Sequence, residues 1–160
     1  MSIKVGEKLP EATFMEPTID GPAPTTTDAV FAGKTIALFA VPGAFTPTCS
    51  AKHLPSFRDA ENSLKSKGVD EVACVSVNDV FVMGEWARTQ QVEGKIRMLA
   101  DGNGAFTRAI GLELDASGFG MGARSQRYCM LVVDGVVKQL NVEEGGAYEV
   151  SSAEYLLGQL

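Results

Sequence analysis

Residues 34–42, KTIALFAVP, form a continuous apolar run that closes on Pro42-Gly43, and this run constrains the fold more than any other feature. A strand with one face in water alternates polar and apolar residues, whereas an uninterrupted run is typical of a strand covered on both faces. Residues 70–79 (DEVACVSVND) and 95–101 (KIRMLAD) share the pattern. We therefore predict three buried strands.

Helical patterns separate these runs, and further signals follow them along the chain. Residues 127–142 carry Asp134-Gly135 between two β-rich runs, which is a strong hairpin signal. The Pro- and Thr-rich residues 17–28 are predicted to form a loop. The segments predicted to be helical are residues 46–68, 80–94, 104–111 and 151–160.

The order of these segments predicts an α/β fold of thioredoxin-like architecture, with a central mixed β-sheet flanked by helices. The chain has 160 residues, of which 45% are hydrophobic, enough for a single buried core. No internal repeat, low-complexity run or linker interrupts it. We expect one domain over residues 1–160.

The charge balance excludes some partners. A formal net charge of −6 without clustered Lys and Arg gives no footprint for nucleic acid or an anionic membrane. No stretch approaches the roughly 20 apolar residues that cross a bilayer, and the first residues lack an apolar signal core. We expect a cytoplasmic protein that binds no membrane. The three cysteines and single histidine have no zinc-like spacing, so no metal is expected.

Cys49 lies where a thiol is easily ionised. Thr46 is a good N-cap and Pro47 suits the first helical position, so Cys49 is expected in the first turn. There the unpaired N–H groups and the helix dipole favour a thiolate. A thiol with a pKa of ~8.5 is only about 3% ionised at neutral pH, and lowering that pKa by ~2.5 requires ~3.4 kcal/mol. A helix end supplies ~0.3–2 kcal/mol, so a nearby cation is needed.

The alternative is that Cys49 is only a small apolar residue at a helix start, as free cysteines usually are. Its position after the tight PGAF turn and beside Thr-Pro favours a reactive thiol.

These residues resemble a known family. Pro42, Thr46 and Cys49 match the Pro-x-x-x-Thr-x-x-Cys motif of peroxiredoxins, and PGAFTPTCSAKHLPSF is similar to the type II branch. The resemblance extends over nearly the whole chain, through VACVSVND, GEWAR, LADGNGAF, RSQRY and VVDGVVKQLNVE. It implies a thiol-dependent peroxidase that acts on hydrogen peroxide and small alkyl hydroperoxides without metal, haem or flavin cofactors, and a homodimer.

The resemblance also implies a role for each site residue. Cys49 would attack the peroxide and become a sulfenic acid, while Thr46 would hydrogen-bond the peroxide and the thiolate. Pro42 would shield the pocket from water, and Arg127 would supply the cation. The backbone N–H groups of Thr48 and Cys49 would hold the peroxide oxygens.

Two side chains near this motif have competing interpretations. Arg124 is as basic as Arg127, but Arg127 shares a strand face with apolar residues, where an arginine needs a partner. We therefore favour Arg127, mostly from the family match. His53, four residues after Cys49, could form a Cys-His dyad, but no Asn or Asp orienter is evident, so a structural or supporting role is favoured.

The reductant is the least constrained part of the prediction. Residues 143–160 contain no cysteine to resolve the sulfenic acid, unlike some relatives. Cys74 stands where certain plant-like members carry a second cysteine, but joining it to Cys49 would require local unfolding. Cys129 is a more remote candidate. Inert packing is favoured for both thiols, so we expect recycling by glutathione, alone or with glutaredoxin, with thioredoxin as the fallback donor.

Two other function classes also use a reactive thiol. A peroxide sensor that passes oxidation to a partner protein would use the same Cys49. A disulfide oxidoreductase is disfavoured because residues 46–52, TPTCSAK, lack a paired cysteine.

Overall fold

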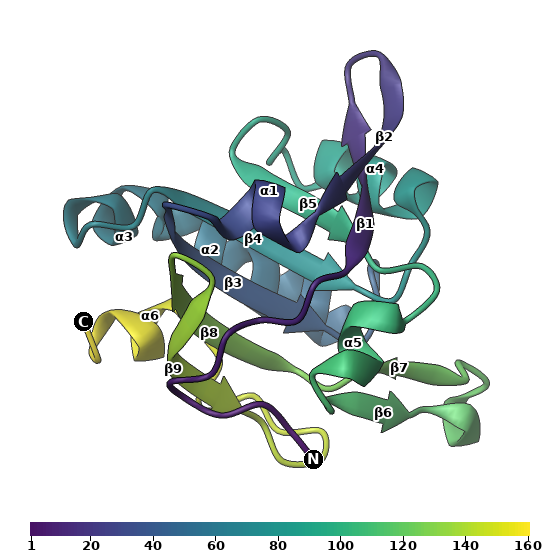
Figure 1. Ribbon diagram of the computed structural model, residues 1–160. Helices are drawn as coiled ribbons and strands as arrows, with labels where there is room; N and C mark the ends of the chain where they lie inside the picture. The colour runs from purple at the N-terminus through teal and green to yellow at the C-terminus, as the bar shows by residue number, and fades with distance from the viewer.

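The computed structural model describes residues 1–160 (Figure 1). Its strands are β1 (Thr13–Thr18), β2 (Gly21–Thr26), β3 (Thr35–Val41), β4 (Glu71–Ser76), β5 (Ile96–Ala100), β6 (Glu113–Asp115), β7 (Ala123–Ser125), β8 (Tyr128–Val133) and β9 (Val136–Val142). Seven of them form one mixed sheet in the order β2-β1-β5-β4-β3-β8-β9, while β6 and β7 pair separately.

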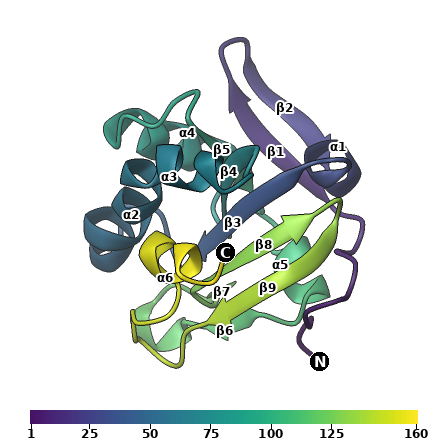
Figure 2. The ribbon, with the colours of Figure 1, turned by 90° about the vertical axis from the view of Figure 1, so that its left-hand side faces the viewer.

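Helices cover both faces of this sheet. They are α1 (Thr27–Phe31), the π-helical turn η1 (Cys49–His53), α2 (Leu54–Asp59), α3 (Glu61–Ser66), α4 (Val80–Thr89), α5 (Ala105–Ala109), the 3-10 turn η2 (Ser117–Phe119) and α6 (Ala153–Leu157). Figures 1 and 2 show α2, α3, α4 and α6 on one face and α1 and α5 on the other. None of these helices has the length and apolar character to cross a membrane.

The three apolar runs form the centre of the sheet, as predicted. Strands β3, β4 and β5 are parallel neighbours, and β8 runs antiparallel to β3. Every residue of β3 after Thr35 is buried, as expected for a strand covered on both faces. Because β3 and β4 are parallel, their carboxyl ends lie side by side at the same end of the sheet. The segment that begins at Pro42 starts from that end.

Two hydrophobic clusters fill the space between the sheet and its helices. The cluster under α2, α3, α4 and α6 contains Cys49, Cys74 and Cys129. The cluster under α1 and α5 includes the opposite faces of the same strands, with Phe14 and Phe106 packed together at 5.0 Å between ring centroids. All three thiols therefore lie on one side of the sheet.

The predicted loop at residues 17–28 is wrong. This segment completes β1, forms all of β2 and starts α1, so it is an antiparallel hairpin followed by a helix. Pro22 and Pro24 lack the N–H that an inner strand needs, but β2 is the edge of the sheet, where proline is tolerated. The Thr26 side chain caps α1 by accepting from Ala29 N.

The predicted hairpin at Asp134-Gly135 is confirmed between β8 and β9. Both residues have positive φ, 48° and 78°, as a two-residue hairpin turn requires. The Asp134 carboxylate also accepts a hydrogen bond of 2.6 Å from Gly33 N.

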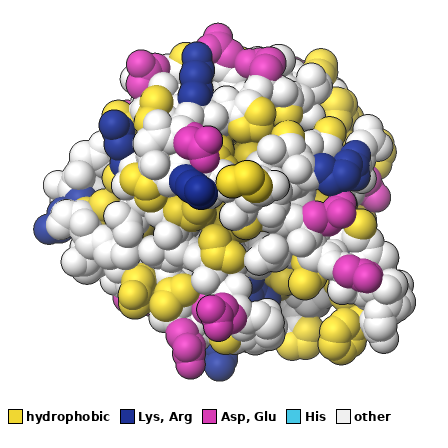
Figure 3. Space-filling view, turned by 60° about the horizontal axis from the view of Figure 1, so that its bottom comes forward, with side chains coloured by type: hydrophobic (Ala, Val, Ile, Leu, Met, Phe, Trp, Pro, Cys, Tyr) yellow, Lys and Arg dark blue, Asp and Glu magenta, His cyan; other side chains and the backbone are white.

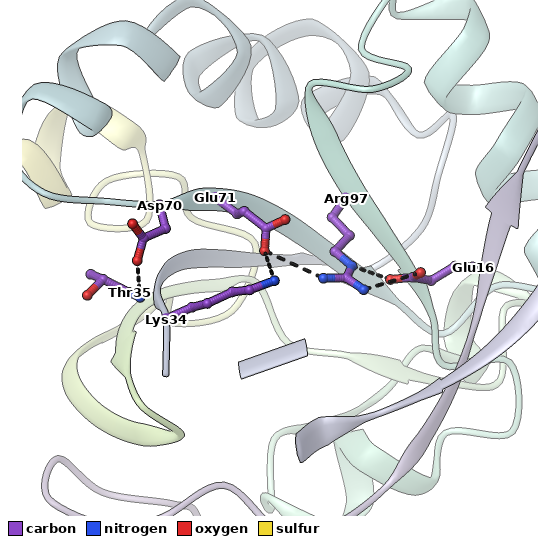
Figure 4. A network of polar contacts seen from close by, with 6 residues as sticks. All are labelled: Glu16, Lys34, Thr35, Asp70, Glu71 and Arg97. Atoms are coloured by element: carbon purple, nitrogen blue, oxygen red, sulfur yellow. Dashed lines mark hydrogen bonds and ion pairs between the residues drawn. The ribbon is translucent and has the colours of Figure 1, made fainter. Parts of the chain in front are cut away.

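A network of charged side chains bridges neighbouring strands of the sheet (Figure 4). Arg97 on β5 pairs with Glu16 on β1 and lies 3.5 Å from Glu71 on β4, which Lys34 also contacts at 3.1 Å. Arg97 and Glu16 are 25% and 17% exposed, whereas Lys34 and Glu71 are 39% and 36% exposed. The Arg97 pairs are therefore less screened by solvent than the Lys34 pair.

We expect Arg97→Met to lower the free energy of unfolding by about 1–2 kcal/mol, between the value of an exposed ion pair and that of a buried one. Lys34→Met removes the more exposed partner of the Glu71 carboxylate. It should lower the free energy of unfolding by less than about 1 kcal/mol. Urea unfolding of the two variants measures the difference. Equal losses would contradict the special position of Arg97.

Candidate active site

A tightly held loop, residues 42–46, leads from the end of β3 to the helix that carries Cys49. The Thr46 hydroxyl donates to Gly43 O at 2.7 Å, and Ala44 N donates to the side chain of Asn78, just beyond β4, at 3.0 Å. These bonds tie the loop to both strand ends and fix where the helix begins.

Gly43 is needed for this packing. A Cβ at this position would lie 3.1 Å from Met121 Cε and 3.2 Å from Thr46 Cγ2. Phe45 adopts the left-handed conformation, φ 67°, at a cost of roughly 1–2 kcal/mol. The loop therefore has a specific backbone path that the surrounding contacts impose.

The helix begins at Pro47, and Cys49 is its third residue, as predicted. The first helical hydrogen bond runs from Ser50 N to Thr46 O at 2.9 Å, which makes Thr46 the N-cap residue. The backbone N–H groups of Thr48 and Cys49 make no hydrogen bond within the protein. Cys49 has no exposed surface, so its sulfur is buried in the helical turn that carries these unpaired donors.

The rest of the predicted helix 46–68 differs in form. Leu54 N donates to Cys49 O, so the turn from Cys49 to His53 is widened to a π-helical turn, and the helix breaks at Ala60 before α3. Pro55 has no N–H to continue the regular pattern, and a wider turn directly before it accommodates that loss. The segment predicted to be helical is therefore helical from Pro47 onward, but it is divided into η1, α2 and α3.

Arg127 brings a positive charge to the sulfur. It directly precedes β8, and its Nη2 donates to Cys49 Sγ at 3.2 Å. Alternation along β8 places Cys129 and Leu131 in the same cluster, so this face of the strand points to Cys49. Arg124 instead donates to two carbonyls, Met121 O at 2.9 Å and Val77 O at 3.0 Å. Of the two candidate arginines, the structure brings Arg127 to Cys49.

His53 contacts this arginine and not the cysteine. Its Nδ1 accepts from Arg127 Nη1 at 3.0 Å, and its Nε2 donates to Ser151 O at 2.9 Å. Burial, reinforced by the charge of Arg127, lowers the pKa of His53 to about 3. The ring is therefore neutral, and its one lone pair is already used, which disfavours a general base for Cys49.

The same shift makes stability depend on pH. Because the native pKa of His53 lies below its unfolded value of ~6.5, the unfolded chain binds the extra proton first, and acid favours unfolding. We expect the free energy of unfolding to fall by about 2 kcal/mol from pH 7 to pH 5. His53 is the only histidine, so His53→Asn should flatten this slope in urea titrations. An equal slope in both proteins would contradict the assignment.

The other two thiols are buried beside a phenylalanine. Cys74 on β4 and Cys129 on β8 both pair in register with Phe39 on β3, which separates them. The Cα atoms of Cys74 and Cys129 are therefore two strand spacings apart, each of ~4.8 Å. A disulfide allows at most ~7 Å between Cα atoms, so these two cysteines cannot form one. Burial raises the pKa of Cys129 to about 12 and raises the pKa of Cys74 well above its usual value. Both thiols are therefore protonated at neutral pH.

Three further predicted residues, Pro42, Thr46 and Thr48, lie close to Cys49 along the chain. The hydroxyl proton of Thr46 is donated to Gly43, so its free lone pair can accept a hydrogen bond from an incoming molecule. Pro42, which follows β3, and Thr48, in the first helical turn, are partly buried. The elements thus place Pro42, Thr46, Thr48 and Arg127 at one end of the helix that carries Cys49.

Sequence reasoning did not find Ser151, Glu143, Trp86 or Ser50. The Trp86 indole donates to Ser50 Oγ at 3.0 Å, and Ser50 directly follows Cys49 in the chain. Ser151 lies 98 positions from His53, and Glu143 holds Ser151 through two hydrogen bonds. Contacts between residues so far apart in the chain leave no local sequence pattern. Of these four residues, only Trp86 lies in a motif that the sequence analysis names, GEWAR.

No group of His, Cys, Asp and Glu side chains is gathered as metal ligands would be. An open groove lies elsewhere, lined by residues that include Glu16, Glu71 and Arg97 of the Figure 4 network. We place the chemistry at Cys49 and not in that groove, because only Cys49 combines unpaired N–H donors, a guanidinium and a nucleophilic atom.

Comparison with known proteins identifies the family. The Redoxin family model matches residues 4–157. Peroxiredoxin-2E, chloroplastic, of Arabidopsis thaliana is 50% identical over 163 residues, covering 99% of this chain and 70% of the relative. Peroxiredoxin-2B of the same plant is 46% identical over 160 residues, covering 99% and 98%. Reduced Prx3 of Vibrio vulnificus, solved in complex with hydrogen peroxide, is 52% identical, with a TM-score of 0.94 and 98% of each chain covered.

The motif at Cys49 agrees with the fold and with the family match over residues 4–157. It also agrees with relatives that share about half of their residues with this chain. This chain therefore belongs to the type II peroxiredoxins, thiol peroxidases of thioredoxin-like fold.

Proposed function

We propose that Cys49 is the peroxidatic thiolate and that it reduces hydrogen peroxide and small alkyl hydroperoxides. The observation that carries this proposal is the Arg127 guanidinium 3.2 Å from the Cys49 sulfur, at a helix N-terminus with unpaired N–H groups. Cys49 has no exposed surface, which favours small substrates. A relative that was solved with hydrogen peroxide supports the substrate class.

The first step is a displacement at oxygen. The sulfur electron pair of Cys49 forms an S–O bond with the nearer peroxide oxygen while the O–O bond breaks, and the leaving hydroxide or alkoxide takes a proton to become water or alcohol. Arg127 and the N–H groups of Thr48 and Cys49 face the charge that moves from sulfur to the leaving oxygen. Thr46 accepts a hydrogen bond from the peroxide O–H and orients it, and Pro42 shields the pocket.

We further propose that an external thiol, glutathione alone or with glutaredoxin, reduces the sulfenic acid. The first thiol forms a mixed disulfide with Cys49 and releases water. A second thiol then attacks the outer sulfur of that mixed disulfide, forms a disulfide with the first thiol and releases Cys49 as the free thiol. The support is that Cys74 and Cys129 are buried and have raised pKa values, so neither is a ready thiolate.

An internal disulfide with Cys74, recycled by thioredoxin, is the second candidate. Cys74 lies in the same cluster as Cys49, and its pKa is raised first by burial and then by the nearby charge of Cys49. The first helical turn would have to open for the bond to form. A sensor that relays oxidation to a partner protein would use the same first step.

Intact mass after one equivalent of hydrogen peroxide separates these cycles. We expect the wild type and Cys74→Ser each to gain one oxygen, and then to take up glutathione when it is added. Loss of two hydrogens in the wild type alone would instead establish Cys74 as the resolving cysteine. Steady-state turnover with glutathione and glutaredoxin supports the enzyme, whereas a single stoichiometric oxidation with every reductant would favour the relay.

A homodimer is the proposed assembly, in keeping with the family. Phe45 beside the active site and Phe119 in the Gly-rich loop are 49% and 87% exposed and are available for contact with a second copy. Figure 3 shows acidic and basic side chains interspersed on one face, without a patch of one sign, and no histidine reaches that surface. Sedimentation at micromolar concentration tests the assembly.

A further inference from the structure

A chain of hydrogen bonds connects the carboxylate of Glu143 to the Cys49 sulfur through the only histidine. It runs from Glu143 to Ser151, from the Ser151 carbonyl to His53, and from His53 to Arg127, which contacts Cys49. We propose that His53 is a positioning residue for the Arg127 guanidinium and that Glu143 holds His53 in place. This inference rests on the proposed role of Cys49.

The Arg127 guanidinium needs an orienting partner that leaves its charge intact. Its long side chain is flexible, and no carboxylate forms an ion pair with it, unlike Arg58, Arg88, Arg97 and Arg108. A carboxylate in place of His53 would orient the group but neutralise the charge that faces the sulfur. A neutral imidazole orients it without that loss, because it accepts one N–H and adds no charge.

The Ser151 carbonyl determines which nitrogen of His53 is the acceptor. A carbonyl can only accept, so the imidazole proton resides on Nε2, 2.9 Å from Ser151 O. Nδ1 then carries no proton and accepts a hydrogen bond from Arg127 Nη1 at 3.0 Å. Burial keeps the pKa of His53 near 3, so the ring retains this state across physiological pH.

Glu143 holds the segment that presents this carbonyl. One of its oxygens, Oε2, accepts from the backbone N–H groups of Glu149, Val150 and Ser151 at 2.8–2.9 Å and from the Ser151 hydroxyl at 2.7 Å. Burial by itself would raise the pKa of Glu143, but these donors hold it below its usual value. The backbone N–H of Glu143 also donates to Arg127 O at 2.9 Å. Glu143 therefore hydrogen-bonds both to the segment that contacts His53 and to the backbone of Arg127.

Two polar replacements of His53 separate its two contacts. His53→Asn places an amide oxygen near the position of Nδ1 and keeps an acceptor for Arg127, whereas His53→Gln reaches the position of Nε2 and loses that acceptor. Trp86, the only tryptophan, donates to the neighbour of Cys49, so its fluorescence follows oxidation by hydrogen peroxide in a stopped-flow instrument. Alkylation by iodoacetamide, at a pH where the thiol is fully ionised, measures reactivity that needs no oriented guanidinium.

We expect His53→Gln to react with peroxide about tenfold more slowly or worse, with His53→Asn at least about threefold faster than His53→Gln, while alkylation rates of both match the wild type. Glu143→Ala should slow the peroxide reaction similarly and Glu143→Gln much less, because an amide oxygen can replace Oε2. The double variant His53→Gln/Glu143→Ala should be no slower than the single variants, since both act through Arg127.

The inference is overturned if both His53 variants react with peroxide as fast as the wild type, or if the two substitutions slow the reaction additively. It is also overturned if peroxide and alkylation rates fall together, which would indicate a general structural role. A wild type that does not react with peroxide at Cys49 would instead defeat the proposed function. Thermal unfolding of each variant establishes that it is folded.

Discussion

Cys49→Ser is expected to abolish peroxide reduction, with a rate lower by about 10⁴-fold or more, and to leave the fold intact. A serine hydroxyl is not ionised at neutral pH and forms no sulfenic acid, so the chemistry loses its nucleophile. The oxygen is smaller than sulfur and can still accept from Arg127, so the buried position keeps a partner for the guanidinium.

The measurement is stopped-flow oxidation together with steady-state peroxide consumption. Cys74→Ser and Cys129→Ser are the matched controls, since both thiols are buried in the same cluster and neither contacts Arg127 by a hydrogen bond. Both controls should retain the first oxidation step. Peroxide reduction that persists in Cys49→Ser and is lost in Cys74→Ser would move the reactive centre to β4.

Arg127→Ala is expected to have the second largest effect, slowing the reaction with peroxide by about 10²–10³-fold. The substitution removes the only guanidinium at the sulfur and the donor that faces the moving charge, and it leaves the acceptor nitrogen of His53 without its partner. Cys49 should therefore react more slowly, because no cation stabilises the charge that moves to the leaving oxygen.

Arg127→Lys is the informative comparison. An ammonium restores the charge but, as a point charge, does not reproduce the fork that reaches both Cys49 and His53. We expect its peroxide rate to lie between those of Arg127→Ala and the wild type. An Arg127→Ala variant that reacts at the wild-type rate would contradict the role of the guanidinium and would direct attention to Arg124.

The sequence predicted the parts of the fold that depend on local patterns. The apolar run at residues 34–42 marks β3, Asp134-Gly135 marks the β8–β9 turn, and Thr46 with Pro47 marks the start of the helix. Each of these depends on burial, turn conformation or capping within a few residues. The β1–β2 hairpin was missed because its prolines are compatible with a strand only at the sheet edge, and edge position is a property of the whole sheet.

The candidate site was predictable for the residues of one motif and harder beyond it. Pro42, Thr46 and Cys49 lie within one short stretch, whereas the choice of Arg127 over Arg124 depended mostly on the family match. The contacts of His53 with Ser151, and of Ser151 with Glu143, join segments far apart in the chain. A local pattern shows that His53 shares a helix with Cys49, but it does not show which partner its ring meets.

The rate constant for oxidation of Cys49 by hydrogen peroxide at neutral pH, followed by mass of the peptide that contains it, tests the proposed role of this site most directly. We expect Cys49 to react at least about 10²-fold faster than free cysteine, because Arg127 and the unpaired N–H groups at the helix N-terminus face the charge that moves from sulfur to oxygen. A rate constant equal to that of free cysteine would contradict this expectation.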